Sequence, residues 1–161
     1  MYRMPYALAV VVTSTMLMSS TQPVTARAAD APVADAAMHG DGDTVRALLA
    51  DGGDVNTAQG DGMTALHWAA FRDDVVLAAA LIEADADIAA ATRVGGITPL
   101  SMAATNGSVA MIDLLVEADA LVNWPTSTGA TPLMAAATSG RVDAVGRLLD
   151  HGALVNARET A

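Results

Sequence analysis

The apolar positions of this chain recur at a fixed spacing. Three runs begin with threonine and continue mostly apolar: residues 64–70 (TALHWAA), 98–104 (TPLSMAA) and 131–137 (TPLMAAA), which start 34 and 33 residues apart. A threonine hydroxyl can accept a hydrogen bond from an unpaired N–H at a helix start, and proline at the first helical position loses no hydrogen bond. Leucine and an alanine pair then provide a narrow apolar face. The pattern predicts a helix start that is repeated along an array.

Each run is followed by a second apolar segment, so the chain is predicted to form helix pairs. A degenerate first copy, residues 32–39 (PVADAAMH), keeps the proline and an alanine pair but lacks the threonine. Glycine, which readily adopts the left-handed conformation that ends a helix, separates the helices in three of the four pairs. The predicted pairs are 32–39 with 41–51, 65–72 with 75–84, 99–106 with 109–118, and 132–139 with 142–151.

Aspartate stands at three places where other copies have glycine. Asp73 lies between the helices of the second pair, and Asp85 and Asp119 follow the second helices of the second and third pairs. Aspartate enters the left-handed region more readily than most residues, but less readily than glycine. We therefore expect the second and third units to be less stable than copies with glycine.

This combined pattern resembles the ankyrin repeat. The shared features are the T-P-L-H-x-A-A opening, the glycine-separated helix pair, the closing G-A-x-V-N, and turn-rich segments whose glycines suit tight hairpins. The resemblance implies an all-α repeat fold, or α-solenoid: an ankyrin-repeat stack of helix-turn-helix units with projecting β-hairpin loops. It also implies that His67 ties neighbouring hairpins by hydrogen bonds. It covers residues 32–156, with repeats at about 31–60, 61–93, 94–127 and 128–161.

The fourth unit is not followed by a polar closing helix pair. Repeat stacks depend on terminal units with polar outer faces for solubility. We therefore expect the apolar face of the last unit to be covered by a partner, by self-association or by further sequence.

The first 28 residues are predicted to be a cleaved secretory signal peptide. Arg3 supplies a positive start, residues 7–18 form an uncharged, mostly apolar run, and Ala26-Arg27-Ala28 provides small residues before a cut after Ala28. The alternative is a permanent membrane anchor, but a spanning helix needs roughly 20 apolar residues. The mature domain, residues 29–161, would then be free of the membrane. The short signal and the alanine-rich composition favour a bacterial periplasm, with full secretion as the alternative.

The charge of the chain restricts its partners. Eight arginines, no lysine and 18 acidic residues give a net charge of −10. Because phosphate binding relies on lysine and arginine, nucleic acids and anionic membrane surfaces are not predicted partners. The absence of cysteine excludes disulfides, thiolate zinc sites and a thiol nucleophile.

No group of residues in the sequence predicts catalysis, so the chain is predicted not to be an enzyme and to need no cofactor. Ser101 and Ser139 lack a histidine in a triad arrangement. Gly95-Gly96 lacks the lysine and the strand-to-helix context of a phosphate loop. Asp73-Asp74 is interpreted as a solvated turn.

The family resemblance implies that partners bind a concave surface formed by the hairpin tips and the C-terminal ends of the first helices. Phe71, the only phenylalanine, and Arg72 follow the repeated run directly, and aromatic residues and arginine are frequent interface anchors. Trp68 is expected in the core. The predicted partner-binding residues are Met38, His39, Asp61, Met63, Phe71, Arg72, Ile97, Thr105, Asn106, Trp124, Thr138 and Ser139.

The leading hypothesis is a non-enzymatic module that is exported to the periplasm and binds a protein on this concave surface. A first alternative is an accessory factor for an oxidative-stress enzyme such as catalase, which would handle haem or another cofactor through His39 and His151. The structural interpretation of these two histidines is that they lie near helix C-termini, where a cation interacts favourably with the helix dipole. A second alternative is a secreted effector that binds a host protein.

Overall fold

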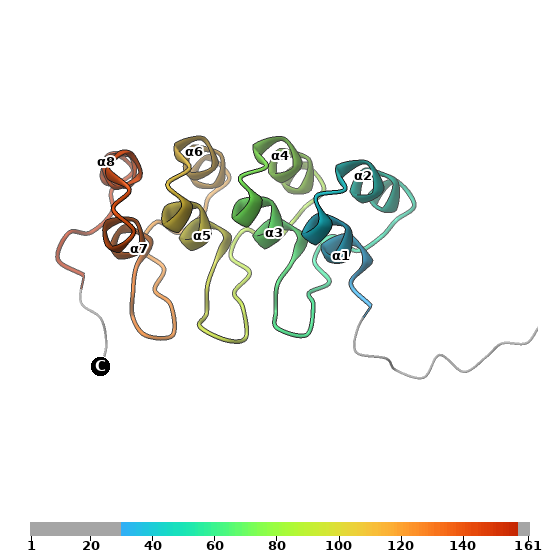
Figure 1. The fold of residues 1–161 in the computed structure, drawn as a ribbon, viewed down its shortest axis with the longest axis horizontal. Coiled ribbons are helices and arrows are strands. Elements are labelled where there is room, and N and C mark those ends of the chain that lie inside the picture. Colours follow the sequence, from blue (N-terminus) through green and yellow to red (C-terminus); the bar gives the residue numbers. More distant parts are fainter. Residues whose placement is uncertain (1–29, 158–161) are drawn as a thin grey trace, which may run out of the picture.

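The computed structural model describes residues 30–157, which form eight α-helices and no β-strand. Figure 1 shows two layers: α1, α3, α5 and α7 form an inner layer, and α2, α4, α6 and α8 form an outer layer, with loops projecting on the inner side. Every predicted helix boundary agrees with the structure to within one residue. The helices are α1 (Pro32–His39), α2 (Gly42–Ala50), α3 (Ala65–Arg72), α4 (Val75–Glu83), α5 (Pro99–Asn106), α6 (Val109–Glu117), α7 (Pro132–Thr138) and α8 (Val142–Asp150).

The inner helices α3, α5 and α7 start where the threonines stand. The hydroxyls of Thr64, Thr98 and Thr131 each accept a hydrogen bond from the backbone N–H three residues later. Asp41, Asp74 and Ser108 cap the outer helices α2, α4 and α6 in the same way. Each such cap satisfies an N–H that the helix itself leaves without a partner. The last outer helix, α8, has Arg141 at this position, and Arg141 forms no such bond.

The core consists of the surfaces between neighbouring units. The alanine pairs Ala69-Ala70 and Ala103-Ala104 have no exposed surface, and their small side chains allow the inner helices to approach closely. Leucine, isoleucine and methionine fill the space between the two layers, as at Leu81, Ile112 and Leu115. One hydrophobic cluster runs from the first unit to the last. A single unit would therefore lack most of its core.

The three aspartates adopt the conformation expected from the sequence. Asp73, Asp85 and Asp119 have φ angles of 59°, 61° and 70°, and they are the non-glycine residues with positive φ in the described part of the chain. Gly140, which corresponds to Asp73 in the fourth unit, has a φ of 68°. These three backbone positions favour glycine, so the aspartates are expected to lower the stability of their units.

The projecting loops are joined to one another by backbone hydrogen bonds. The Arg93 N–H donates to the Asp61 carbonyl at 2.8 Å, and the Ser127 N–H donates to the Gly95 carbonyl at 2.9 Å. A Cβ atom at Gly62 would lie 2.6 Å from the Arg93 nitrogen, so only glycine permits this approach. The predicted projecting loops are therefore present between the described helices, but they contain no β-strand and are joined to one another by single backbone hydrogen bonds.

Replacing Asp73, Asp85 or Asp119 with glycine should raise the free energy of unfolding by about 1 kcal/mol each, because glycine has no steric penalty at positive φ. Urea unfolding followed by circular dichroism at high salt, which screens the change in charge, measures the effect. The matched control is Gly140→Asp, which has no neighbouring atom within 4 Å of the new Cβ and should lose a similar amount. If none of the four variants changed the free energy of unfolding, a steric penalty for aspartate at these positive φ angles would be contradicted.

Candidate functional site

An aromatic pair is exposed on the inner layer of the stack. The rings of Trp68 and Phe71, one turn apart on α3, meet edge to face with centroids 5.8 Å apart and an interplanar angle of 89°. The Phe71 side chain is 57% exposed, while Trp68 is partly buried against the core. Trp68, expected in the core, therefore lies between the core and the surface. A large aromatic surface held by a second ring is a favourable anchor for a partner.

A hydrogen-bond network fixes the orientation of Trp68. Its indole N–H donates to Gln59 Oε1 at 2.8 Å, and Gln59 Nε2 donates to Asp35 Oδ1 at 2.6 Å. Gln59 Nε2 also approaches the Met38 sulfur at 3.7 Å. The network connects the projecting loop between α2 and α3 to both α1 and α3. Because Trp68 is already ordered, a partner that contacts Phe71 would not have to order its supporting ring.

Half-buried and exposed side chains occupy the corresponding positions on the other inner helices. Met102 occupies in α5 the position that Trp68 has in α3, four residues after the capping threonine, and it is half-buried. Thr105 and Thr138 occupy in α5 and α7 the position of Phe71, and both are exposed. We refer to this set as the inner-helix face: Met38, Trp68, Phe71, Met102, Thr105 and Thr138.

Arg72 and Asn106, both predicted to bind a partner, also hold the stack together. Arg72 Nη1 donates to the Met38 carbonyl at 3.3 Å. Asn106 Nδ2 donates to the carbonyls of Phe71 at 2.9 Å and Ala70 at 3.1 Å. Each side chain thus caps the C-terminus of the preceding inner helix, where carbonyls lack intrahelical partners. This role is not evident from the sequence, because the contacts join residues 34 to 36 positions apart.

The other predicted contacts differ in their exposure. Met63 is only 8% exposed and offers a partner little surface. Ile97 is half-buried, and its carbonyl is already engaged by the ring of His67. The remaining three are exposed: His39 and Ser139 near the ends of α1 and α7, and Asp61 in the first projecting loop.

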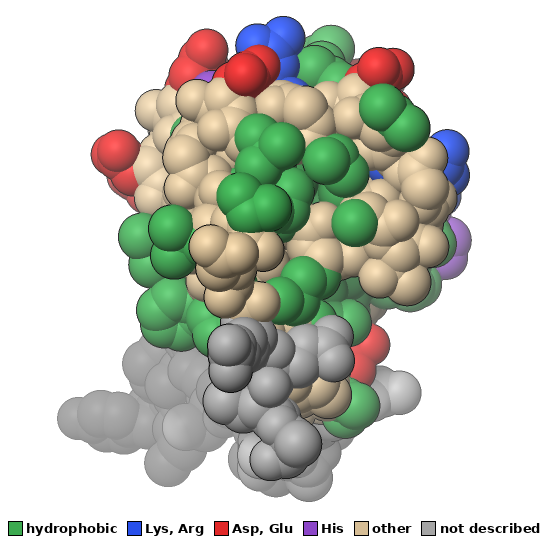
Figure 2. Space-filling view, turned by 90° about the vertical axis from the view of Figure 1, so that its left-hand side faces the viewer, with side chains coloured by type: hydrophobic (Ala, Val, Ile, Leu, Met, Phe, Trp, Pro, Cys, Tyr) green, Lys and Arg blue, Asp and Glu red, His purple; other side chains and the backbone are tan. Residues whose placement is uncertain are grey.

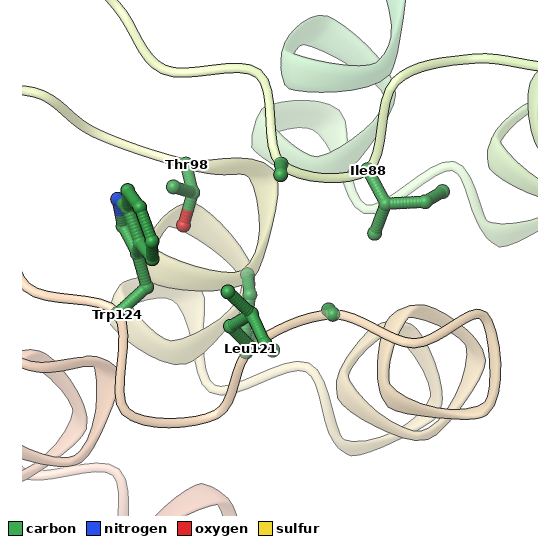
Figure 3. Close-up of a pocket in the computed structure, with 7 residues that line it drawn as sticks. Ile88, Thr98, Leu121 and Trp124 are labelled. Carbon is green, nitrogen blue, oxygen red and sulfur yellow. The ribbon is translucent and has the colours of Figure 1, made fainter.

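Trp124 lies away from the inner-helix face. It lines a small cavity with Thr98, Ile88 and Leu121 (Figure 3). Thr98 precedes α5, whereas Thr105 lies near the other end of that helix. The cavity volume of about 10 Å³ is room for at most one water molecule, so it is not a ligand site. Trp124 itself is 46% exposed.

The cavity lies where a repeated hydrogen-bond bridge is missing. Asn56 donates to the Asp85 carbonyl at 3.0 Å and accepts from the Asp87 N–H at 2.7 Å, which joins the first and second units. Asn123 joins the third and fourth units through the Gly152 carbonyl and the Leu154 N–H. The second unit has Ala89 at this position, so it has no amide side chain that could form the corresponding bridge to the third unit.

His67 is a framework residue. The Thr64 N–H donates to His67 Nδ1 at 3.2 Å, so Nδ1 is unprotonated and the Nε2–H donates to the Ile97 carbonyl at 2.9 Å. Burial, only partly offset by the bond to Ile97, lowers the pKa of the His67 imidazole. The neutral ring thus connects α3 to the next projecting loop, as the family resemblance implies.

Asp73, Asp74 and His151 also have structural roles. Asp73 ends α3 in the left-handed conformation, and Asp74 caps α4 by accepting from the Leu77 N–H at 2.9 Å. His39 lies on α1, whereas His151 follows α8 and bonds to Asp113 at 2.8 Å. These histidines lie in the first and last units, so a single haem could not be held by both.

Two further findings concern residues 30–157 only. No group of three or more histidine or acidic side chains there is arranged to hold a metal ion. None of the helices in that part of the chain has the length and apolar character needed to cross a membrane.

Replacing Ala89 with asparagine should restore the missing bridge between the second and third units. By analogy with Asn56, the new amide would donate to the Asp119 carbonyl and accept from the Leu121 N–H. We expect the free energy of unfolding to rise by about 1 kcal/mol. The control is Ala91→Asn at a nearby exposed position, which should change little. If urea unfolding gave the same change in free energy for Ala89→Asn and Ala91→Asn, the proposed bridge would be excluded.

The free energy of unfolding should decrease as the pH falls below about 6.5, which is the pKa of an unperturbed histidine. The reason is that His67 binds a proton more readily in the unfolded chain than in the folded one. His67→Ser, which copies Ser101 of the third unit, should be less stable than wild type at pH 7.5 because the Ile97 bond is lost. On acidification, the difference in unfolding free energy between wild type and His67→Ser should then become smaller, by up to about 1.4 kcal/mol per pH unit. A difference that does not change with pH would contradict the buried neutral ring.

The arrangement of residues 30–157 agrees with the comparison with known families. The chain matches the family described as "Ankyrin repeats (3 copies)" over residues 17–92, 33–123 and 77–159. No curated protein matches the chain. The repeated helix pairs, the projecting loops and this match lead to one conclusion: the chain belongs to the ankyrin-repeat family, whose members are typically protein–protein interaction modules.

Proposed function

We propose that this protein binds another protein through its inner-helix face, with Phe71 at the centre of the contact. The observation that carries the proposal is the exposure of Phe71 beside a tryptophan that the Gln59–Asp35 network already holds in place. Such an aromatic pair combines a large apolar surface with a fixed orientation. Threonine and serine side chains at the ends of α5 and α7 supply a polar rim.

The chemistry of the face indicates the kind of partner. Apolar side chains, Met38 and Met102, flank the aromatic pair, which favours a partner that presents aliphatic or aromatic side chains there. The chain as a whole has a net charge of −10, so a partner with basic groups around this apolar centre is favoured electrostatically.

We infer that the protein is exported to the periplasm. The supporting signal peptide, residues 1–28, lies outside the described residues, so the inference depends on the sequence pattern alone. Mass spectrometry of the protein from fractionated cells tests it. A mature chain that begins at Ala29 in the periplasmic fraction is expected. Recovery from the medium would favour the secreted effector, and an intact N-terminus inside the cell would contradict export.

A photo-crosslinking amino acid at position 71 should capture the partner in cells, because this side chain lies at the proposed centre of contact. The matched control is position 76 on α4, where Val76 is also apolar and is 69% exposed. Proteins captured from position 71 but not from position 76 are identified by mass spectrometry. Capture from position 76 alone would contradict the proposed surface.

Phe71→Ala should weaken the affinity for the identified partner by tenfold or more, about 1.4 kcal/mol at least, because a central aromatic contact is lost. Isothermal titration measures this change. Val76→Ala should leave the affinity unchanged. The unfolding midpoints of both variants should stay close to that of wild type, because each side chain is mostly exposed.

A further inference from the structure

The aromatic pair of Trp68 and Phe71 has a carboxylate beside it. Asp35 occupies in α1 the position that Trp68 has in α3, and these two helices pack side by side (Figure 1). A single amide joins the two side chains. Gln59 Nε2 donates to Asp35 Oδ1 at 2.6 Å, while Gln59 Oε1 accepts from the Trp68 indole N–H at 2.8 Å. One negative group and two rings therefore share one site at the edge of the inner-helix face.

The Asp35 carboxylate is free to accept a further hydrogen bond. Asp35 is exposed, and within residues 30–157 its second oxygen, Oδ2, has no hydrogen-bond partner. Gln59 holds the first oxygen, so the carboxylate has a fixed position next to the indole. A donor from a partner would meet a group that is already ordered, which lowers the entropic cost of binding.

The arginines of the protein that lie nearby do not neutralise this carboxylate. Arg72 Nη1 donates to the Met38 carbonyl at 3.3 Å, and Arg93 Nη1 donates to the Gly60 carbonyl at 2.7 Å. Neither forms an ion pair with Asp35. The chain as a whole carries a net charge of −10. A positive group from a partner is therefore favoured at Asp35 both by this carboxylate and by the long-range field of the protein.

The two rings favour the same kind of group. The face of an aromatic ring is electron-rich and attracts cations. The rings of Trp68 and Phe71 stand at 89° to each other, and Phe71 is 57% exposed. A guanidinium is planar, so it can stack on a ring while its N–H groups donate in its own plane to a carboxylate. A lysine ammonium is more strongly hydrated and lacks this planar geometry.

We propose that the partner presents an arginine side chain to this site. The guanidinium stacks on the Trp68–Phe71 pair and donates to Asp35 Oδ2. The apolar stem of the arginine lies against the neighbouring Met38, because long charged side chains cover apolar surface with their methylene groups. This inference depends on the proposed function, and it names the group through which the partner is recognised.

The test needs a probe that distinguishes this site from other apolar surface. Hydrophobic side chains also gather at the end of the stack formed by α7 and α8 (Figure 2). Leu154 and Val155 there are 60% and 76% exposed, and no aromatic ring lines the hollow beside them. Trp124 is 46% exposed, but no charged side chain lines its small cavity. A purely apolar probe would bind in several places, whereas an arginine side chain requires both a ring and a carboxylate.

N-acetylarginine amide is the probe, and NMR of the purified protein provides the readout. The two tryptophans of the chain, Trp68 and Trp124, give separate indole N–H signals. The probe should shift the Trp68 signal, with saturation at about millimolar concentrations, and should leave the Trp124 signal in place. N-acetylcitrulline amide has nearly the same shape without the charge and should shift neither signal. No shift at Trp68, or equal shifts with the citrulline or lysine derivative, would overturn the proposal.

Asp35→Asn should weaken binding of N-acetylarginine amide by about fivefold, because the ion pair is lost. The matched control is Asp51→Asn, which removes the same charge at an exposed position after α2 and should change the affinity little. Equal weakening by both variants would show attraction by overall charge alone and would overturn the proposed contact with Asp35.

Phe71→Leu separates this inference from the proposed function, once the partner has been identified by crosslinking at position 71. Leucine keeps an apolar surface but has no ring face, so Phe71→Leu should weaken the affinity for that partner as much as Phe71→Ala does. Wild-type affinity in Phe71→Leu with weakened affinity in Phe71→Ala would overturn the arginine contact and leave the proposed function intact. Wild-type affinity in both variants would contradict the proposed function, and this inference with it.

Discussion

The close approach of neighbouring inner helices is the constraint on which the whole structure depends. Alanine pairs such as Ala69-Ala70 and Ala103-Ala104 are fully buried between helices, and a larger side chain there would force the units apart. The larger apolar residues between the two layers can pack only because this spacing is kept. Stability therefore belongs to the contacts between units and depends little on any unit alone.

A set of long-range hydrogen bonds complements this packing. Arg72, Asn106 and Arg141 each donate from one unit to a carbonyl at the end of the preceding inner helix. His67 connects an inner helix to the next projecting loop. Some side chains at the binding surface thus serve the framework as well. Phe71 differs, because its side chain makes an aromatic contact within its own helix and leaves most of its surface free.

Much of the fold could be predicted from the sequence because local chemistry determines it. Capping threonines and the left-handed positions of Asp73, Asp85 and Asp119 depend on residues close in the chain, and the structure confirms them. The candidate surface was harder to predict. The helix-capping bonds of Arg72 and Asn106 and the position of Trp124 depend on neighbouring units more than 20 residues away. Short-range periodicity carries no information about such contacts.

The linear order of the units implies a gradient of local stability along the chain. Within residues 30–157 the fourth unit contacts the third unit on one side only, and α8 lacks a side-chain cap at Arg141. This unit should open more often than the others, by local unfolding that leaves the rest of the stack folded. Trp68 and Phe71 belong to the second unit, which has neighbours on both sides. The aromatic surface is therefore insulated from fraying at the C-terminal end, and it can stay in place while the last helix pair exchanges between closed and open forms.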